Sequence, residues 1–152
     1  MKFNKIVALA LALVMVFALC ACGGGDKGTA DNGEKVVKIG VFEPASGDSG
    51  AGGKKEMLGM QYANQETPTV EIGGETYKVE LVYSDNGSDS AKAVSAASKL
   101  VNEKVSLVLG SYGSGVSIAA SDTFKQAGIP AIGVTCTNPN VTAGNSHYFR
   151  IC

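Results

Sequence analysis

The sequence predicts an α/β fold, a Rossmann-like lobe in which a parallel sheet carries helices on both faces. Two observations support this prediction. Apolar runs rich in β-branched residues, such as residues 36–42 and 105–110, are typical of strands buried on both faces. These runs alternate with stretches of helical periodicity, and strands separated by helices imply right-handed crossovers within a parallel sheet.

Local signals place the elements in order along the chain. Gly73 and Gly74 mark a hairpin turn between two strands, and Ser88 or Asp89 can cap the helix that follows the hairpin. Gly128 stops the last helix, with Pro130 just beyond it. We expect helices at residues 54–65, after residue 89 and at residues 116–127. We expect strands at residues 36–42, 69–72, 77–83, 105–110, 130–134 and 147–152.

Parallel sheets bind ligands beyond the carboxyl ends of their strands. Ser111, Ser114 and Ser117 stand where a predicted strand ends and a helix begins, where free N–H groups and the helix dipole favour an anion. Thr135 and Thr137 follow the next strand and offer carbonyl and hydroxyl acceptors for an ammonium group. This set suits a small zwitterion, although the same residues could simply cap helices and turns. The expected ligand loops are residues 43–53, 84–89, 111–117 and 135–140.

Several other functions are excluded by what the sequence lacks. The balance of 13 Lys+Arg against 14 Asp+Glu argues against nucleic-acid binding, and one His with four scattered Cys offers no zinc site. A phosphate loop fails because Asp48 and Lys55 stand where Gly and Ser or Thr are needed. A hydrolase elbow around Ser114 fails because Tyr112 and Val116 replace the required glycines. We therefore expect no enzyme activity, no metal and no cofactor.

The first residues predict export and lipidation. A basic start precedes the uncharged run 6–19, which is too short to cross a hydrocarbon core that needs about 20 residues. The run ends in Leu-Cys-Ala-Cys at residues 19–22, which resembles the bacterial lipobox with Cys22 as the lipidated residue. We expect a signal peptide at 1–21, a lipidated flexible tether at 22–35 and an extracytoplasmic, membrane-anchored protein; the alternative is an uncleaved membrane anchor. Only Cys136 and Cys152 would then remain to pair or stay free.

The folded part, residues 36–152, also resembles a known family through an ordered set of short motifs. The motif residues are Gly40, Ser46, Gly47, Glu56, Gly59, Asp85, Gly110, Ser114, Gly128, Pro130, Thr137, Asn138, Pro139, Tyr148, Phe149 and Arg150. This ordered set resembles the branched-chain amino-acid (leucine-binding) substrate-binding proteins of ABC importers, which have the type I periplasmic-binding fold.

The resemblance implies a two-lobed protein that closes on an amino acid and delivers it to an ABC permease. By position, Ser114 would bind the ligand carboxylate, while the Thr137 hydroxyl and the Thr135 carbonyl would face the ammonium. Gly52 stands where a relative has an aromatic residue over the ligand side chain, which leaves the preferred side chain open. The second lobe is absent, so residues 36–152 would be an incomplete N-terminal lobe. The alternatives are an amide, urea or aromatic-acid ligand, or a sensor that reports to a receptor.

Overall fold

The computed structural model describes residues 33–152. The expected signal peptide 1–21, the lipidation site Cys22 and most of the tether 22–35 lie outside these residues. In order, the described elements are β1 (Val36–Val41), α2 (Gly50–Glu66), β2 (Thr69–Ile72), β3 (Glu75–Tyr83), α3 (Ser90–Asn102), β4 (Leu107–Leu109), α4 (Ser114–Gln126), β5 (Ala131–Gly133), the 3-10 turn η1 (Pro139–Val141) and β6 (Tyr148–Arg150).

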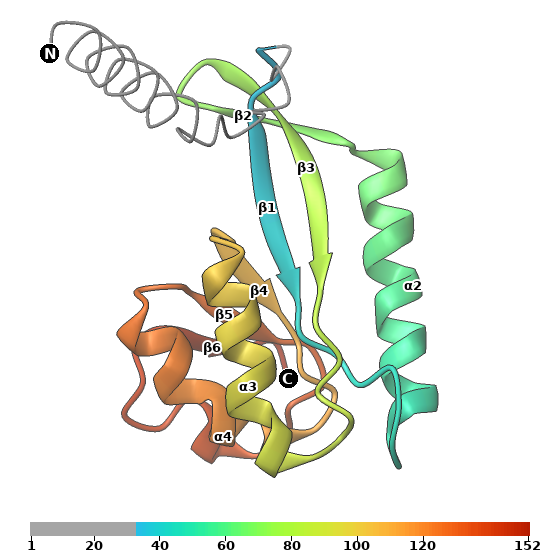
Figure 1. The fold of residues 1–152 in the computed structure, drawn as a ribbon, viewed down its shortest axis with the longest axis vertical. Helices are drawn as coiled ribbons and strands as arrows, with labels where there is room; N and C mark the ends of the chain where they lie inside the picture. The colour runs from blue at the N-terminus through green and yellow to red at the C-terminus, as the bar shows by residue number, and fades with distance from the viewer. Residues whose placement is uncertain (1–32) are drawn as a thin grey trace, which may run out of the picture. The chain divides into compact units, whose positions relative to one another are not determined.

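The strands form one sheet in the order β2-β3-β1-β4-β5-β6 (Figure 1). All neighbouring strands run parallel except β2, which pairs antiparallel with β3. The predicted turn at Gly73 and Gly74 joins these two, and both glycines have positive φ, which a two-residue hairpin turn favours. The predicted parallel sheet is therefore confirmed, with one antiparallel edge strand.

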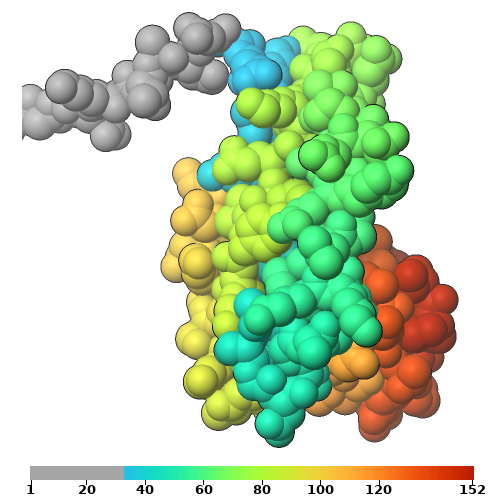
Figure 2. Space-filling view, turned by 90° about the vertical axis from the view of Figure 1, so that its right-hand side faces the viewer, coloured from blue at the N-terminus to red at the C-terminus, as the bar shows by residue number. Residues whose placement is uncertain are grey.

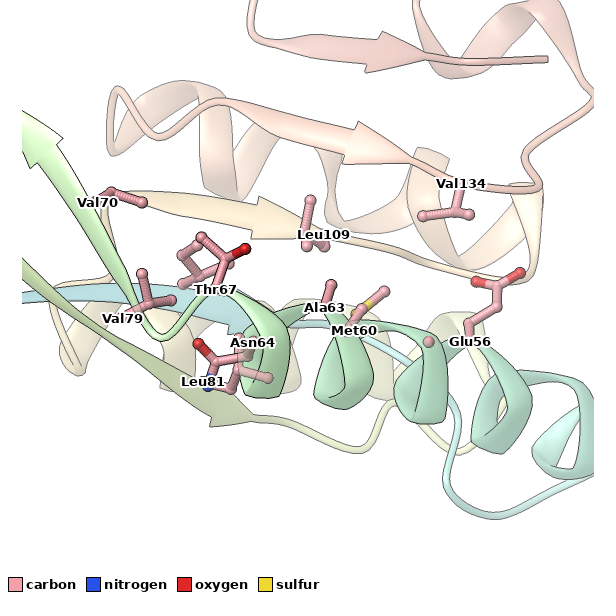
Figure 3. A pocket seen from close by; sticks show the side chains of 12 residues that line it. Glu56, Met60, Ala63, Asn64, Thr67, Val70, Val79, Leu81, Leu109 and Val134 are labelled. Carbon is pink, nitrogen blue, oxygen red and sulfur yellow. The ribbon is translucent and has the colours of Figure 1, made fainter.

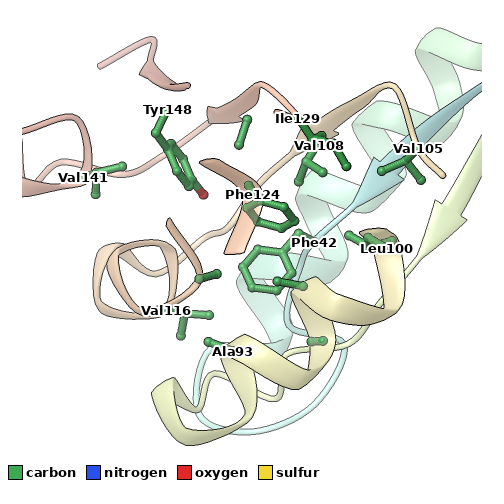
Figure 4. Close-up of a cluster of buried hydrophobic side chains, with 14 of the residues drawn as sticks. Phe42, Ala93, Leu100, Val105, Val108, Val116, Phe124, Ile129, Val141 and Tyr148 are labelled. Carbon is green, nitrogen blue, oxygen red and sulfur yellow. The ribbon is translucent and has the colours of Figure 1, made fainter. Parts of the chain in front are cut away.

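The hydrophobic core lies on the face of the sheet that α3 and α4 cover. Phe42 and Phe124 are fully buried at its centre, with ring centroids 5.4 Å apart and planes at 85° (Figure 4). Ala93 and Ala97 are also fully buried, because small side chains let α3 approach closely. Edge-to-face aromatic pairs of this kind add specific geometry to the burial of apolar surface.

The opposite face is covered less completely, by α2 alone among the described helices. Because neighbouring residues of a strand point to opposite faces, Leu109 lies on the α2 side while Val108 lies in the core. A groove of about 480 Å³ separates α2 from this face, and Met60, Ala63 and Leu81 also line it (Figure 3). Figure 2 looks onto α2, with β3 on one side and the C-terminal segments on the other.

The bounds of several elements differ from those predicted. The helix α2 begins at Gly50, four residues before the predicted start, although Gly has a low helix propensity. Of the two candidate caps for α3, Asp89 is the one observed, and its side chain accepts a hydrogen bond from Ala91 N at 2.8 Å. Among the helices of residues 33–152, none combines the length and the apolar character that crossing a membrane would require.

Candidate ligand-binding site

Ser114 is the first residue of α4, immediately after the cap residue Gly113. The first intrahelical hydrogen bond runs from Ser117 N to Gly113 O at 3.1 Å, so the N–H groups of Ser114, Gly115 and Val116 point beyond the helix end. The Ser114 hydroxyl oxygen accepts a hydrogen bond from Asn138 N at 3.2 Å, which leaves its O–H free to donate. The end of α4 can therefore offer several donors to one anion.

Thr135 and Thr137 lie in the loop after β5, beside the start of α4. The Thr135 hydroxyl lies 2.7 Å from Glu56 Oε1 and 3.2 Å from Tyr112 O, both of which are acceptors. The Thr137 side chain is exposed, and its carbonyl accepts a hydrogen bond from Arg150 Nη1 at 3.0 Å. Since Asn138 bonds to Ser114, the structure brings the start of α4, which carries Ser114, together with the loop that carries Thr135 and Thr137.

Ser111 and Ser117 are buried beneath this surface and bond to each other. The Ser117 hydroxyl accepts from Ser111 N at 3.2 Å and lies 3.1 Å from the thiol of Cys136, which donates to Ser111 O at 2.9 Å. Desolvation raises the pKa of the Cys136 thiol, although the hydrogen bond with Ser117 opposes this. Cys136 and Cys152 are both free thiols. Of the three serines, Ser114 alone remains available to a ligand.

Two more of the expected ligand loops are joined by Asp85. Its carboxylate accepts from Ala45 N at 2.8 Å and from Ser46 Oγ at 2.7 Å. Slight desolvation opposes ionisation, but these hydrogen bonds, led by that from Ser46, lower the pKa of Asp85. Gly47 must be glycine at this contact, because a Cβ there would lie 2.0 Å from the carbonyl oxygen of Gly87. Loops 43–53 and 84–89 therefore behave as one unit.

Sequence reasoning gave no role at the site to two carboxyl groups that support it, although Glu56 stood among the motif residues of the resemblance. Glu43 lies two residues after the end of β1 and is 1% exposed, and its Oε2 accepts from Tyr112 N at 2.7 Å. Glu56, on α2, accepts the hydrogen bond from Thr135. The available signal was a glutamate at the start of a predicted ligand loop, directly after a run of buried apolar residues.

Tyr112 covers the position where the resemblance expects an aromatic residue at Gly52. A Cβ on Gly52 would lie 2.5 Å from the Tyr112 ring, so the ring occupies the space that a side chain at residue 52 would take. Tyr112 is 41% exposed and lies next to the loop that carries Ser114. An aromatic surface is therefore present beside the site, although it comes from a different loop.

Almost all of the described part of the chain matches one protein family. The model of the periplasmic binding protein family matches residues 36–151. The chain belongs to that family. Since the family's relatives are named as binding proteins, they indicate a binding protein rather than an enzyme. Within residues 33–152, no group of three or more His, Cys, Asp or Glu side chains could hold a metal ion.

Individual relatives of this periplasmic binding protein agree with the match. A Leu/Ile/Val-binding protein homolog 2 of Brucella abortus is 33% identical over 140 residues, covering 91% of this chain and 36% of the relative. A leucine binding protein of Thermotoga maritima superposes with a TM-score of 0.71 at 36% identity, covering 77% of this chain and 33% of that one. A branched-chain amino acid transporter substrate binding protein of Streptococcus pneumoniae, in complex with isoleucine, superposes with a TM-score of 0.68 at 33% identity. This match covers 76% of this chain and 33% of that one. The chain thus spans about a third of the length of its relatives.

Proposed function

We propose that this chain is the N-terminal part of an extracytoplasmic substrate-binding protein of an ABC importer that captures an amino acid of the branched-chain type. The observation that carries the proposal is the start of α4. There, the N–H groups of the first turn have no intrahelical partner, and the Ser114 hydroxyl contacts the loop that carries Thr135 and Thr137 through Asn138 N. The relatives named for leucine, isoleucine and valine support the ligand class, and their transporter names support delivery to a permease.

In this proposal the two ends of a zwitterion meet different chemistry. The ligand carboxylate accepts hydrogen bonds from the end of α4 and from Ser114, where the helix dipole adds favourable electrostatics. The ammonium faces the carbonyl of Thr135 and the hydroxyl of Thr137. A second lobe, outside this chain, would supply the opposite jaw and exclude water from the ligand. Without it, we expect leucine to bind this chain weakly.

The test is a titration of the 152-residue chain with leucine, followed by ¹⁵N-resolved NMR. Saturable shifts should concentrate at residues 114–116 and 135–138. Isoamylamine, which is leucine without its carboxylate, should not produce the shifts at 114–116. Ser114→Ala should weaken binding about ten-fold or more, because a hydrogen bond to a charged group contributes about 1.5–3 kcal/mol. Ser95→Ala, an exposed serine on α3, is the matched control.

Two results would count against this binding mode. Equal shifts with leucine and isoamylamine at residues 114–116 would contradict the assignment of the carboxylate site. Micromolar leucine affinity of this chain alone, measured by calorimetry, would contradict the need for a second lobe.

The proposal that residues 36–152 form an incomplete lobe is supported by the groove beside α2. Parallel sheets are normally covered on both faces, yet Leu109 and Val134 line an open groove, and Phe149 is 52% exposed. The chain covers about a third of its relatives. We assign the groove to polypeptide that follows residue 152 in a longer protein. An open reading frame beyond codon 152 that encodes an apolar helix would support this assignment, and a stop codon there would contradict it.

Export and anchoring are part of the same proposal, with a signal peptide at 1–21, Cys22 lipidated and a tether at 22–35. Metabolic labelling with a fatty acid tests it in the producing bacterium. Cys22→Ser should abolish labelling and membrane retention, whereas Cys20→Ser should leave both unchanged. Labelling that persists in Cys22→Ser would contradict the assignment.

A further inference from the structure

Two carboxyl oxygens near the candidate site have no hydrogen-bond partner. They are Glu43 Oε1 and Glu56 Oε2, both buried. Glu43 Oε1 lies against the backbone, since a Cβ on Gly110 would come within 2.5 Å of it. Glu56 reaches from α2 at the Val134 end of the groove (Figure 3). Buried polar atoms are rarely left unpaired, so this pair requires an explanation.

The other oxygen of each carboxyl is well bonded, and each bond leads to a ligand loop. Glu43 Oε2 accepts from Tyr112 N at 2.7 Å, in the loop after β4. Glu56 Oε1 accepts from the hydroxyl of Thr135 at 2.7 Å, in the loop after β5. The two glutamates therefore contact both loops that carry the candidate ligand residues.

The charges around Glu43 and Glu56 do not favour the state in which both side chains are ionised. The groups that interact electrostatically with Glu43 are Glu56 from α2, Cys136 from the loop after β5 and Tyr148 from β6, none of which is a cation. Within residues 33–152, the ion pairs lie elsewhere, at Lys35–Glu75, Lys38–Glu103 and Lys78–Glu34. Two ionised carboxylates in contact, without a cation, are strongly unfavourable.

A single proton on this pair of carboxyl groups would supply the missing hydrogen-bond donor and would remove one of the two negative charges. We propose that Glu43 and Glu56 share a single proton between Glu43 Oε1 and Glu56 Oε2, and that this bond fixes α2 to the loops of Tyr112 and Thr135. As carboxylates, neither oxygen can donate, whereas one protonated carboxyl supplies the donor that the other accepts. Glu43 and Glu56 are then positioning residues for the ligand site. Only that last role rests on the proposed function.

The pKa of Glu43 is shifted in the direction that a shared proton requires. Burial, and then the neighbouring Glu56 carboxyl, raise the pKa of Glu43 from 4.5 to about 9, while the hydrogen bond from Tyr112 opposes the rise. A folded pKa above the unfolded value means that the folded chain keeps a proton that the unfolded chain has released. The stabilisation is complete below about pH 4.5 and is lost as the pH rises to about 9.

The pH dependence of urea unfolding tests the proposal on the 152-residue chain without any ligand. Between pH 5.5 and 8.5, this site should raise the unfolding constant up to about ten-fold per pH unit. Glu43→Gln retains an acceptor for Tyr112 and a donor for Glu56, so it should remove that slope. Glu66→Gln, an exposed glutamate on α2, should leave the slope unchanged. Equal slopes for the wild type and Glu43→Gln would overturn the proposal.

A direct measurement covers the case in which Glu43→Gln fails to fold. In the wild type, ¹³C NMR of the glutamate carboxyl carbons should show one group that stays protonated at pH 7. The Tyr112 ¹⁵N–H signal should titrate together with that group. In Glu56→Gln, the new amide can donate to Glu43, so both titrations should move to lower pH. If every glutamate carboxyl were ionised at pH 7, the shared proton would be excluded, while the binding proposal would be unaffected.

Discussion

Three glycines of α2 provide a sharp test of how this helix packs. A Cβ added at Gly53 would lie 2.2 Å from the carbonyl oxygen of Pro44, whereas one added at Gly59 would meet nothing within 4 Å. At Gly52 the obstacle is the Tyr112 ring, at 2.5 Å. The same substitution at these positions of one helix therefore meets rigid backbone, a movable side chain or open space.

The magnitudes follow from these distances. Replacing Gly by Ala inside a helix stabilises it by roughly 0.5–1 kcal/mol, and Gly59→Ala should gain that amount in full. In Gly53→Ala the contact with Pro44 must open by at least about 0.8 Å to reach the 3.0 Å that real Cβ atoms respect. Overpacking of this kind costs about 1–3 kcal/mol, so the net result should be a loss of about 1–2 kcal/mol. Gly52→Ala should fall between the two, because the half-exposed Tyr112 ring can move aside.

Urea unfolding followed by circular dichroism measures all three variants against the wild type. The expected order of stability is Gly59→Ala, then Gly52→Ala, then Gly53→Ala. If Gly53→Ala were as stable as Gly59→Ala, then α2 would not begin against Pro44, and the position of Glu56 beside Glu43 would lose its support. Gly52→Ala should also change Tyr112 fluorescence, which Gly59→Ala should not.

Two further predictions concern the core and the loops. Phe124→Ala should lower the free energy of unfolding in urea by about 3–5 kcal/mol, because it empties a fully buried site against Phe42. Ile118→Ala, on the exposed side of α4, should lower it far less. Similar losses for the two variants would contradict the described core. Asp85→Asn should destabilise the chain at neutral pH, because the Asn amide has no charge and no second oxygen to accept from Ser46 Oγ, and that hydrogen bond is the leading cause of the lowered pKa of Asp85. This difference should shrink as the pH falls below about 4, where the unfolded chain begins to bind a proton, and should vanish only below the lowered pKa of folded Asp85, where both states are protonated. Asp122→Asn is the exposed control, and a pH-independent difference would refute the hydrogen-bond explanation.

The order of elements could be predicted because each signal is local. The apolar run that ends at Val41 and Phe42 predicts β1, and these two residues are fully buried. The cap of α3 is equally local, because Asp89 bonds to Ala91, two residues along the chain. The bounds were less predictable where packing decides them. The start of α2 at Gly50 contradicts helix propensity, because Gly50 and Gly53 are buried against the loop that precedes them. The spacing of apolar residues along the sequence does not predict this contact between the start of α2 and the preceding loop.

The candidate site likewise has features that the sequence predicts and features that depend on packing. The adjacency of Ser114 and Thr137 follows from topology, since the loops after neighbouring parallel strands meet at one edge of the sheet. The contact of Glu43 with Glu56 does not follow, because it depends on the rotation of α2 against the sheet. Residue type and position at a strand end could not separate Ser114 from Ser111 and Ser117, which differ from it in burial; the family resemblance alone singled out Ser114.

The strand β6 limits the conditions under which this chain can be studied. Among the described residues it pairs only with β5, and Phe149 within it and Ile151 just after it are 52% and 71% exposed. An edge strand with free backbone groups and apolar neighbours is a template on which another strand can add. The chain should therefore self-associate through β6 as its concentration rises, and weak ligand binding must be measured where sedimentation shows a monomer.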